Sequence, residues 1–322
     1  MMNILETVRG RQTIAVSGHI GPDGDCVGSC LGMALYLRKN LPGVCVDVYL
    51  GDFSDALRRN IPGTGTVIYD YKPRHERYDA FIALDCGRER LGDAQEMFDR
   101  AALTINIDHH VSNPGTGMIN FVDGNASSAC ELAYLTMDPD LVDQDTARAL
   151  YVGMVTDTGV FKYSNTSERT MQIAGHLMTY GFDHSAVVRE VFYEKTFIQQ
   201  KIMGIALEKA FTECGGLVVA SLLDWKTQHS LGVSKKDIDG ISAQLALTEG
   251  ADCAILLYAT ATGEWKGSLR SNRYVDAAAL CQNFKGGGHV RAAGCTMYGE
   301  GEKCLQKLIG AARIQLEEQG LC

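Results

Sequence analysis

The stretch Leu103-Thr104-Ile105-Asn106-Ile107-Asp108-His109-His110 joins a short apolar run to an acid and two histidines. Residues 103–107 contain β-branched side chains and are typical of a short buried strand. Ligands of open α/β sheets bind outside the carboxyl ends of the strands, where the polar tripeptide would lie. The tripeptide therefore indicates a functional site, although for this stretch taken alone a surface loop that faces water is an alternative.

Two further predicted strands lead into similar polar groups. Residues 13–16 are apolar and precede a loop rich in turn-forming residues, after which helical spacing runs from Val27 to Leu37. Residues 44–50 have a weaker strand pattern, and residues 80–84 have a strong one that ends at Asp85. The loop after the first strand carries His19, Asp23 and Asp25.

Helical patterns alternate with these strands. Residues 128–136 and 145–155 are predicted helices, with Asp145 as the expected N-cap of the second, which runs into Asp157. Residues 167–180 form a further helical pattern that is closed by a glycine. Strands that alternate with helices predict an α/β fold whose N-terminal sheet is doubly wound and mainly parallel.

The second half of the chain is predicted to fold separately. Residues 183–210 have a continuous helical pattern in which glycine and proline are nearly absent, and a new series of mixed strands and helices starts after Gly216. We therefore divide the chain into a domain with the metal site (1–190), a helical connector (191–212) and a smaller α+β domain (213–322). We expect the active site in the cleft between the two domains.

The composition indicates a globular protein in a reducing compartment. The chain has 322 residues, of which 46% are hydrophobic and 21% charged, which suits two domains with apolar cores. The net charge of -9 disfavours a broad surface for duplex nucleic acid, but not a small phosphate-bearing substrate held through a metal ion. We expect neither a signal peptide nor a membrane span. Eleven cysteines without a Cys-x-x-Cys pair suit reduced, buried thiols and a cytoplasmic protein.

The acids and histidines together predict a metal centre. Five acids that converge without cations would repel one another and raise one another's pKa. Carboxylates with a minority of imidazoles and no thiolate favour Mn²⁺, or Mg²⁺, over structural zinc, and so many ligands indicate two divalent metal ions. Unrelated surface acids are the alternative. The residues concerned are His19, Asp23, Asp25, Asp85, Asp108, His109, His110 and Asp157.

Several segments resemble the motifs of the DHH phosphoesterase superfamily. In the first half these are His-Ile-Gly-Pro-Asp-Gly-Asp (19–25) with Gly28-Ser29, Leu-Asp-Cys-Gly (84–87), Asp-His-His (108–110) with Asn113, and Val-Thr-Asp-Thr-Gly (155–159). In the second half, Gly-Gly-Gly-His (286–289) with Ala-Ala-Gly (292–294) resembles the signature of the DHHA1 domain. The matches run in order along nearly the whole chain. Their spacing is similar to that of the stand-alone nanoRNase/pAp-phosphatase branch, also called NrnA-like, although the family usually has serine or threonine at the position of Gly18.

The resemblance implies a role for each residue of the first half. It implies that one metal ion is held by His19, Asp23 and Asp85. It implies that a second ion is held by Asp25, Asp85, His109 and Asp157, with Asp85 as the bridge. Asp108 would orient the neighbouring histidines, which is the usual task of a carboxylate beside a ligating imidazole. His110 would contact the scissile phosphate or protonate the leaving oxygen.

The second half offers groups that suit a phosphate. A glycine triplet allows backbone N–H groups to approach an anion, and His289 and Arg291 add side-chain donors. Arg270 is a bidentate phosphate binder by type. The alternatives are a tight turn for the triplet and a surface position for Arg270. The predicted substrate-binding residues are Arg270, Gly287, Gly288, His289 and Arg291, whereas His75, His176, His184 and His229 have no acidic neighbours at useful spacing and are taken as ordinary residues.

These features predict a metal-dependent hydrolase of phosphoester bonds. The expected substrates are short RNA and linear dinucleotides such as pApA and pGpG, with pAp dephosphorylation as a side activity. Cyclic di-AMP remains an alternative substrate, whereas an inorganic pyrophosphatase or polyphosphatase is disfavoured by the glycine-rich second half. A regulator without catalytic activity is disfavoured because every expected ligand position is filled. The sequence leaves the oligomeric state open, including a homodimer.

Overall fold

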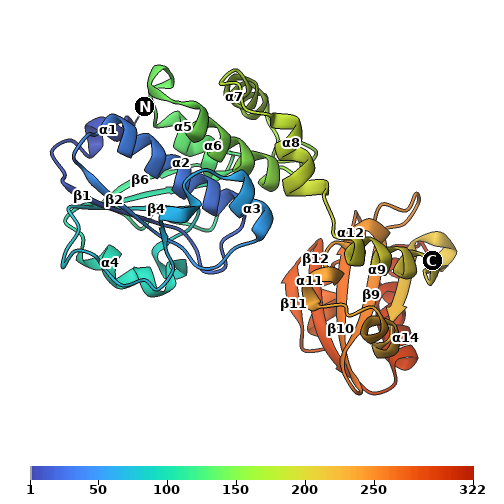
Figure 1. The fold of residues 1–322 in the computed structure, drawn as a ribbon. Helices are drawn as coiled ribbons and strands as arrows, with labels where there is room; N and C mark the ends of the chain where they lie inside the picture. Colours follow the sequence, from blue (N-terminus) through green and yellow to red (C-terminus); the bar gives the residue numbers. More distant parts are fainter. Residues whose placement is uncertain (1) are drawn as a thin grey trace. The chain divides into compact units, whose positions relative to one another are not determined.

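The apolar runs of the first half form a six-stranded parallel sheet in the computed structural model, which describes residues 2–322 (Figure 1). The strand order is β3-β2-β1-β4-β5-β6, so the direction of winding reverses between β1 and β4. Such a reversal opens a crevice at the carboxyl ends of the two strands. The strands are β1 (Thr13–Ser17), β2 (Cys45–Tyr49), β3 (Val67–Ile68), β4 (Ala80–Leu84), β5 (Thr104–Asp108) and β6 (Ile119–Val122). The predicted doubly wound sheet is confirmed.

Helices cover both faces of this sheet. One face carries α2, α5 and α6, which share a large apolar cluster with β1 and β4, and the other face carries α4 with a smaller cluster around Phe81 and Phe98 (Figure 1). The helices of this half are α1 (Ile4–Thr7), α2 (Gly24–Asn40), α3 (Asp55–Asn60), α4 (Gln95–Arg100), α5 (Ala129–Leu135), α6 (Gln144–Asp157), α7 (Glu168–Met178) and α8 (His184–Val188). Both faces of the sheet are therefore buried, as parallel sheets require.

Two helix starts differ from the expectation. Helix α2 begins at Gly24 with Asp23 as its N-cap, so Asp25 lies in the first helical turn and not on the loop. Helix α6 is capped by Asp143, whose carboxylate accepts a hydrogen bond from the Thr146 amide at 2.9 Å, so the predicted cap at Asp145 was wrong. An N-cap side chain binds the amide two or three residues later, and Asp143 has the extended backbone that this requires.

The continuous helix expected over residues 183–210 is interrupted. Helix α8 passes into a π-helical turn (Arg189–Tyr193), and the backbone is then extended at Glu194. Helix α9 (Phe197–Glu208) starts anew with a capping box between Thr196 and Gln199, a pattern that was present in the sequence. It packs through Ile202 and Ala206 onto the apolar cluster of the second sheet.

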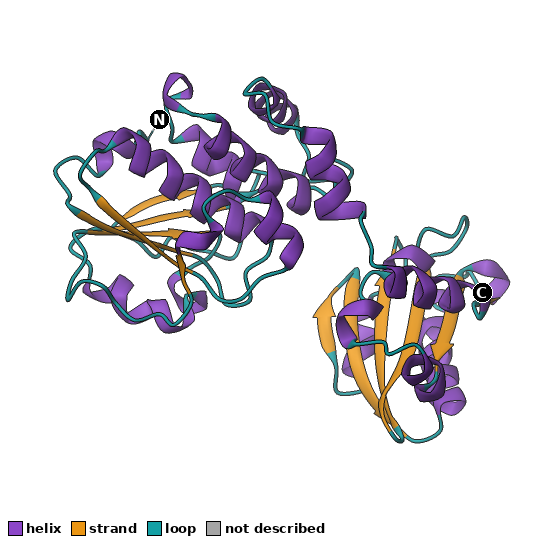
Figure 2. Cartoon of the chain, viewed as in Figure 1, coloured by secondary structure: helices purple, strands orange, loops and turns teal. Residues whose placement is uncertain are grey.

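The chain divides into two compact units, Met1–Glu194 and Lys195–Cys322, and the second unit has its own six-stranded sheet (Figure 2). Its order is β11-β12-β10-β9-β8-β7, and all neighbours are antiparallel except β8 and β9. The strands are β7 (Phe211–Glu213), β8 (Val218–Leu223), β9 (Cys253–Ala261), β10 (Glu264–Ser271), β11 (Gly287–His289) and β12 (Ala292–Tyr298), and the helices after α9 are α10 (Trp225–Ser230), α11 (Lys235–Ile238), α12 (Ile241–Leu245), α13 (Ala277–Gln282) and α14 (Gly301–Glu317). The smaller mixed α+β half is confirmed.

Separate apolar clusters lie on the two faces of the second sheet. One joins α13 and α14 to the strands, and the other joins α9, α11 and α12 to them. Over residues 2–322, no helix combines the length and the apolar character that crossing a membrane would take.

Candidate functional site

The predicted acids and histidines of the first unit gather where the sheet reverses direction. His19 lies two residues after β1, Asp85 directly after β4, and Asp108 at the last position of β5. Asp85 has a positive φ of 60°, a left-handed conformation that is uncommon outside glycine, although aspartate and asparagine adopt it more often than most residues. Backbone strain of this kind concentrates at functional sites.

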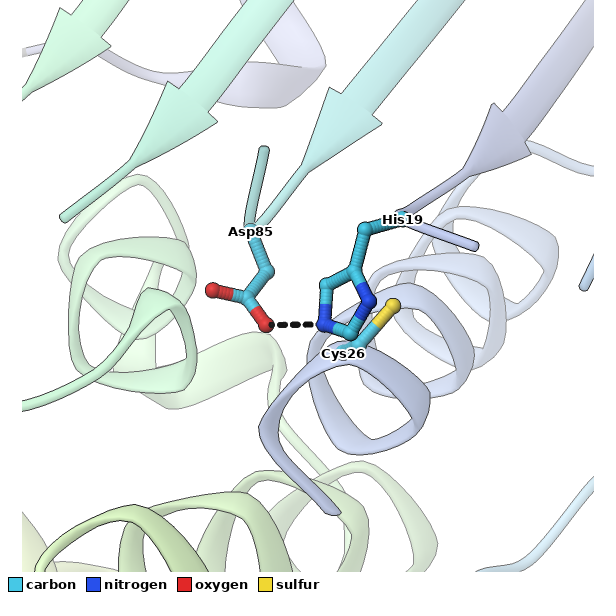
Figure 3. A group of neighbouring side chains, drawn as sticks. All are labelled: His19, Cys26 and Asp85. Atoms are coloured by element: carbon cyan, nitrogen blue, oxygen red, sulfur yellow. Dashed lines mark ion pairs between the residues drawn. The ribbon is translucent and has the colours of Figure 1, made fainter. Parts of the chain in front are cut away.

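Asp85 is at the centre of the cluster. Its Oδ2 lies 3.3 Å from Nε2 of His19, and its Oδ1 lies 3.4 Å from Nε2 of His109. Figure 3 shows the His19 imidazole turned toward the carboxylate, with the Cys26 side chain beside the ring. Within residues 2–322, the buried Oδ1 of Asp85 accepts no hydrogen bond. Because buried carboxylate oxygens are normally paired, this oxygen suits a cation.

Three further acids surround the two imidazoles. Asp23 lies 3.7 Å from His19, and Asp25 and Asp157 each lie 3.7 Å from Nε2 of His109. The Asp25 carboxylate also accepts hydrogen bonds from the amides of Ala129 and Cys130, at 2.6 and 2.9 Å, which are the first two residues of α5. The sequence-predicted metal-ligand residues are therefore brought together, from β1, α2, β4, β5 and α6.

The protonation of the cluster reflects its excess of negative charge. Burial raises the pKa of Asp25 well above its usual range, and the charge of Asp85 adds to this. Burial, partly offset by His109, raises the pKa of Asp157 to about 6. Burial opposes the protonation of His109, but the surrounding carboxylates, Asp85 first, outweigh it and raise the pKa of His109 to about 10. The pKa of His19 is raised in the same way by Asp23 and Asp85.

These residues fit divalent metal ions. Burial and mutual repulsion raise the pKa of Asp25 and Asp157, and divalent cations bound among these carboxylates would favour their ionised forms. Its donors are carboxylate oxygens and imidazole nitrogens, which suit Mn²⁺ and Mg²⁺. The groups whose ligand atoms are close enough to share an ion include Asp85 with His109 and His110, and Asp25 with His109 and Asp157.

Asp108 is fully buried and fixes the side chains around it. Its Oδ1 lies 2.7 Å from Nδ1 of His110, and its Oδ2 accepts a hydrogen bond from the Asn113 amide at 2.6 Å. Asn113 also donates to Asn106 at 2.9 Å. Burial would raise the pKa of Asp108, but His110 and Asn113 outweigh it and lower it. Asp108 therefore remains an anion that orients His110.

The structure adds two residues that the sequence analysis missed. Arg90 lies in a short 3-10 turn after β4, and its guanidinium is 3.3 Å from Nε2 of His110. The sequence analysis gave Arg90 no role. Cys26 lies beside His19 and Asp85, although the ligand set was expected to contain no sulfur. Burial raises the pKa of the Cys26 thiol well above its usual value.

In the second unit, Arg270 and His289 lie in one row of the sheet. Both are paired with Ala292 of the strand between them, Arg270 from β10 and His289 from β11. Directly paired residues point to the same face, and two strand spacings amount to roughly 10 Å. Arg291 instead donates to the Val275 carbonyl at 3.1 Å, so much of its hydrogen-bonding capacity serves the fold.

Gly287 and Gly288 belong to the edge strand β11, which Gly286 precedes, and do not form the tight turn that was the alternative. A Cβ at Gly286 would lie 2.2 Å from the Gly294 carbonyl oxygen, and one at Gly288, whose φ is +148°, would lie 2.5 Å from that of Ala292. These two glycines are required by close strand packing. A Cβ at Gly287 meets nothing within 4 Å, so its missing side chain leaves an open, exposed surface.

Comparison with known proteins matches both halves to families. Residues 13–154 match the DHH family, N-terminal domain, and residues 214–318 match the DHHA1 domain. The chain is 27% identical to the bifunctional oligoribonuclease and PAP phosphatase NrnA of Thermus thermophilus, over 98% of this chain and 94% of that protein. It is also 26% identical to the bifunctional oligoribonuclease and PAP phosphatase NrnA of Bacillus subtilis, over 99% of this chain and 97% of that protein.

A crystal structure of an exopolyphosphatase-related protein from Bacteroides fragilis has the same fold. The TM-score is 0.85 at 24% identity, and the match covers 97% of this chain and 94% of that one. The two family matches lie in the same order as the motifs, one in each unit. The chain belongs to the DHH/DHHA1 phosphoesterase superfamily, in its NrnA-like branch.

Proposed function

We propose that this protein is a metal-dependent phosphodiesterase that hydrolyses short oligoribonucleotides and linear dinucleotides to mononucleotides, with pAp phosphatase activity as a side reaction. The observation that carries the proposal is the Asp85 carboxylate, whose two oxygens each face a different imidazole in a cluster of acids. The full-length similarity to two proteins described as oligoribonuclease and PAP phosphatase supports the substrate class.

Two divalent ions, Mn²⁺ in preference to Mg²⁺, are the proposed cofactors. His19, Asp23 and Asp85 would hold one ion, and Asp25, Asp85, His109 and Asp157 the other. The separate distances from Asp85 to His19 and His109 support a bridging role for this carboxylate. Ions bound there would acidify a water and offset the charge of a phosphate.

His110 is the proposed proton donor to the leaving oxygen. Asp108, at 2.7 Å from Nδ1, orients the ring and raises the pKa of His110. An orienting carboxylate of this kind keeps the proton-transfer group in one position. Arg90, beside the other ring nitrogen, is a candidate for contact with a phosphate oxygen because a guanidinium can donate two parallel hydrogen bonds.

The second unit is proposed to bind the remainder of the substrate. Arg270 and His289 flank the small side chain of Ala292, which leaves space between two donors. Gly287 and Gly288 would present backbone to a phosphate, with Arg291 at the adjoining turn. The net charge of -9 is consistent with a short substrate, because affinity for long nucleic acid rests on many basic contacts.

A substrate panel tests the proposed reaction. Initial rates with Mn²⁺ would be measured on pApA, pGpG, cyclic di-AMP, pAp, pyrophosphate and a long single-stranded RNA at equal concentration. We expect the linear dinucleotides to react fastest. Faster hydrolysis of pyrophosphate or of the long RNA would contradict the proposal, and faster hydrolysis of cyclic di-AMP would replace the linear substrate by the cyclic one.

Variants of the second unit test recognition separately. Arg270→Ala should raise KM for pApA and leave hydrolysis of a generic small phosphodiester unchanged, because the metal ligands are intact. Gly287→Ala is the matched test of the glycine segment, since the added methyl meets no protein atom within 4 Å. An unchanged KM for pApA in both variants would remove the second unit from substrate recognition.

A further inference from the structure

Three potential metal ligands lie toward the amino ends of the strands of the first sheet, whereas the active site lies at the carboxyl ends. Cys45 is the first residue of β2 and Asp47 the third, whereas the active-site residues follow the carboxyl ends of β1, β4 and β5. His75 lies on the segment between β3 and β4. The sequence analysis took His75 as an ordinary residue because Cys45 and Asp47 lie about thirty positions earlier in the chain.

The three side chains point at one another. Nε2 of His75 is 3.5 Å from Sγ of Cys45 and 3.7 Å from Oδ2 of Asp47, and the sulfur is 3.8 Å from the same oxygen. Residues two apart in a strand share a face, which places Cys45 and Asp47 together. A tetrahedral zinc ion, with bonds of about 2.3 Å to sulfur and about 2.0 Å to nitrogen or oxygen, separates its ligand atoms by roughly 3.3–3.5 Å.

The carboxylate of this trio is held in place by other residues. Tyr78 donates to Oδ2 of Asp47 at 2.6 Å, the hydroxyls of Tyr78 and Tyr49 are 2.7 Å apart, and the Arg74 amide donates to Tyr49 at 3.1 Å. The ring of His75 packs edge-on against Tyr78, with centroids 5.1 Å apart. Outer partners of this kind orient metal ligands and raise affinity.

We propose that Cys45, Asp47 and His75 form a second metal site that is selective for Zn²⁺ over Mn²⁺ and Mg²⁺. A thiolate with an imidazole and one carboxylate is a borderline-soft donor set, which zinc accepts and the two hard ions do not. The active site lacks a thiolate ligand, so the two sites differ in the metal that they prefer. Three protein ligands leave one position for water.

Two nearby arginine side chains limit the affinity of this site for zinc. Burial and the adjacent Asp47 raise the pKa of Cys45 above its usual value, and Arg38 and Arg74 offset this only in part. A zinc ion must therefore displace the thiol proton, and the arginines repel a divalent ion, so the site binds zinc less tightly than a four-ligand structural site. Zinc would join the start of β2 to the segment before β4, two parts that Tyr78 already links through Asp47.

Cobalt absorption tests the site directly on the full-length protein. Metal-free protein would be loaded with Mn²⁺ and titrated with Co²⁺, whose bond to a thiolate gives a near-ultraviolet charge-transfer band. We expect this band in the wild type and in Cys322→Ser, a control that removes another exposed cysteine. The band should be absent in Cys45→Ser and should require roughly 100-fold more Co²⁺ in His75→Ala.

Zinc binding provides the second measurement. One equivalent of Zn²⁺ added to the Mn²⁺-loaded protein should raise Tm in the wild type and not in Cys45→Ser, because only the wild type binds it in the folded state. Hydrolysis of pApA without added zinc should be the same in both, since Cys45 is remote from the active site. No cobalt–thiolate band in the wild type, or a band that persists in Cys45→Ser and so comes from Cys26, would overturn the proposal.

Discussion

Asp85 combines a left-handed backbone with a carboxylate that faces two imidazoles. Asp85→Asn is a suitable test, because asparagine tolerates this backbone conformation and the change removes the charge and one of the two ligand oxygens while keeping the size of the side chain. We expect loss of at least one bound metal ion and a fall in kcat/KM of more than about 100-fold, beyond what loss of an outer partner costs. Metal analysis and kinetics measure both effects.

The control is Asp52→Asn, at an exposed side chain in the same unit, which should keep metal and activity. An Asp85→Asn protein that retains two ions and normal turnover would exclude the bridging role.

The side-chain amide of Asn113 donates to Asp108 and Asn106, and its oxygen accepts a hydrogen bond from the Gly115 amide. Asn113→Ala should lower kcat roughly 10- to 100-fold, because His110 loses its fixed orientation, while metal content stays at the wild-type level. Asn120→Ala is the control, since within residues 2–322 the side chain of Asn120 bonds only to the backbone of Gly117. Equal kcat values for the two variants would show that the network does not position His110.

At the residue scale, polar groups at strand ends were the part that sequence could predict. Asp85 and Asp108 follow apolar runs directly, so their positions depend on the strands alone. Arg90 and Cys26 could not be found in this way. The place of Arg90 depends on a 3-10 turn, and that of Cys26 on helix α2 starting at Gly24.

At the scale of elements, α2 and α6 approach closely at Gly28. A Cβ there would lie 2.6 Å from the Ala149 carbonyl oxygen and 3.1 Å from the Gly153 nitrogen. Gly28→Ala should therefore destabilise the first unit by about 1–3 kcal/mol through overpacking. Gly175→Ala in α7, where a Cβ meets nothing within 4 Å, should instead stabilise by up to about 1 kcal/mol.

Urea unfolding followed by far-ultraviolet circular dichroism compares the two glycine variants. If both changed stability in the same direction, steric contact between α2 and α6 would not be the reason for glycine at position 28.

Asp224 caps α10 and makes the second unit sensitive to acid. Burial would raise the pKa of Asp224, but the Thr227 amide and Lys209 outweigh it and lower it to about 2. The contribution of ionised Asp224 to the stability of the folded state is therefore complete above the pKa of this group in the unfolded chain, about 3.9. It is lost as pH falls toward 2. At neutral pH, Asp224→Ala should cost about 1 kcal/mol, and this difference should shrink between pH 4 and about 2.

Unfolding of the second unit at each pH can be followed by tryptophan fluorescence, because both tryptophans, Trp225 and Trp265, lie in this unit. Asp224→Asn is the control, since asparagine caps a helix without a charge and should show no such pH dependence. A constant difference between wild type and Asp224→Ala across this range would contradict the assignment.

Long apolar and periodic segments were predictable as elements, and short ones were not. β4 occupies the residues expected for it, whereas β3 has only two residues and β6 is only partly buried, so neither has a distinct pattern. The break before α9 was missed because apolar spacing continues across it. Its capping box at Thr196 was the available signal.

At the scale of the whole molecule, the two units have separate cores. A chain that ends at Glu194 keeps every predicted metal ligand and omits α9, which packs onto the second core. We expect this shortened protein to fold and bind metal but to lose turnover on pApA, because Arg270 and His289 are absent. Metal analysis, circular dichroism and initial rates would measure this, and turnover at the full-length rate would show that the first unit is sufficient.

The division into two halves could be predicted from the change in element pattern after Gly216. The sequence could not assign α9 to the second core, because its contacts with Val219 and Leu223 are tertiary.

The predicted metal ligands are spread from His19 to Asp157, and they come together only when β4 has paired with β1 and α6 has packed beside α2. During synthesis the proposed ligand set of Asp25, Asp85, His109 and Asp157 therefore stays incomplete until the end of α6 has left the ribosome, so an ion at this position cannot guide the earlier steps of folding. In kinetic terms, interactions absent from the folding transition state act on the unfolding rate. A bound ion would then preserve the finished unit by delaying its opening and would leave its rate of formation unchanged.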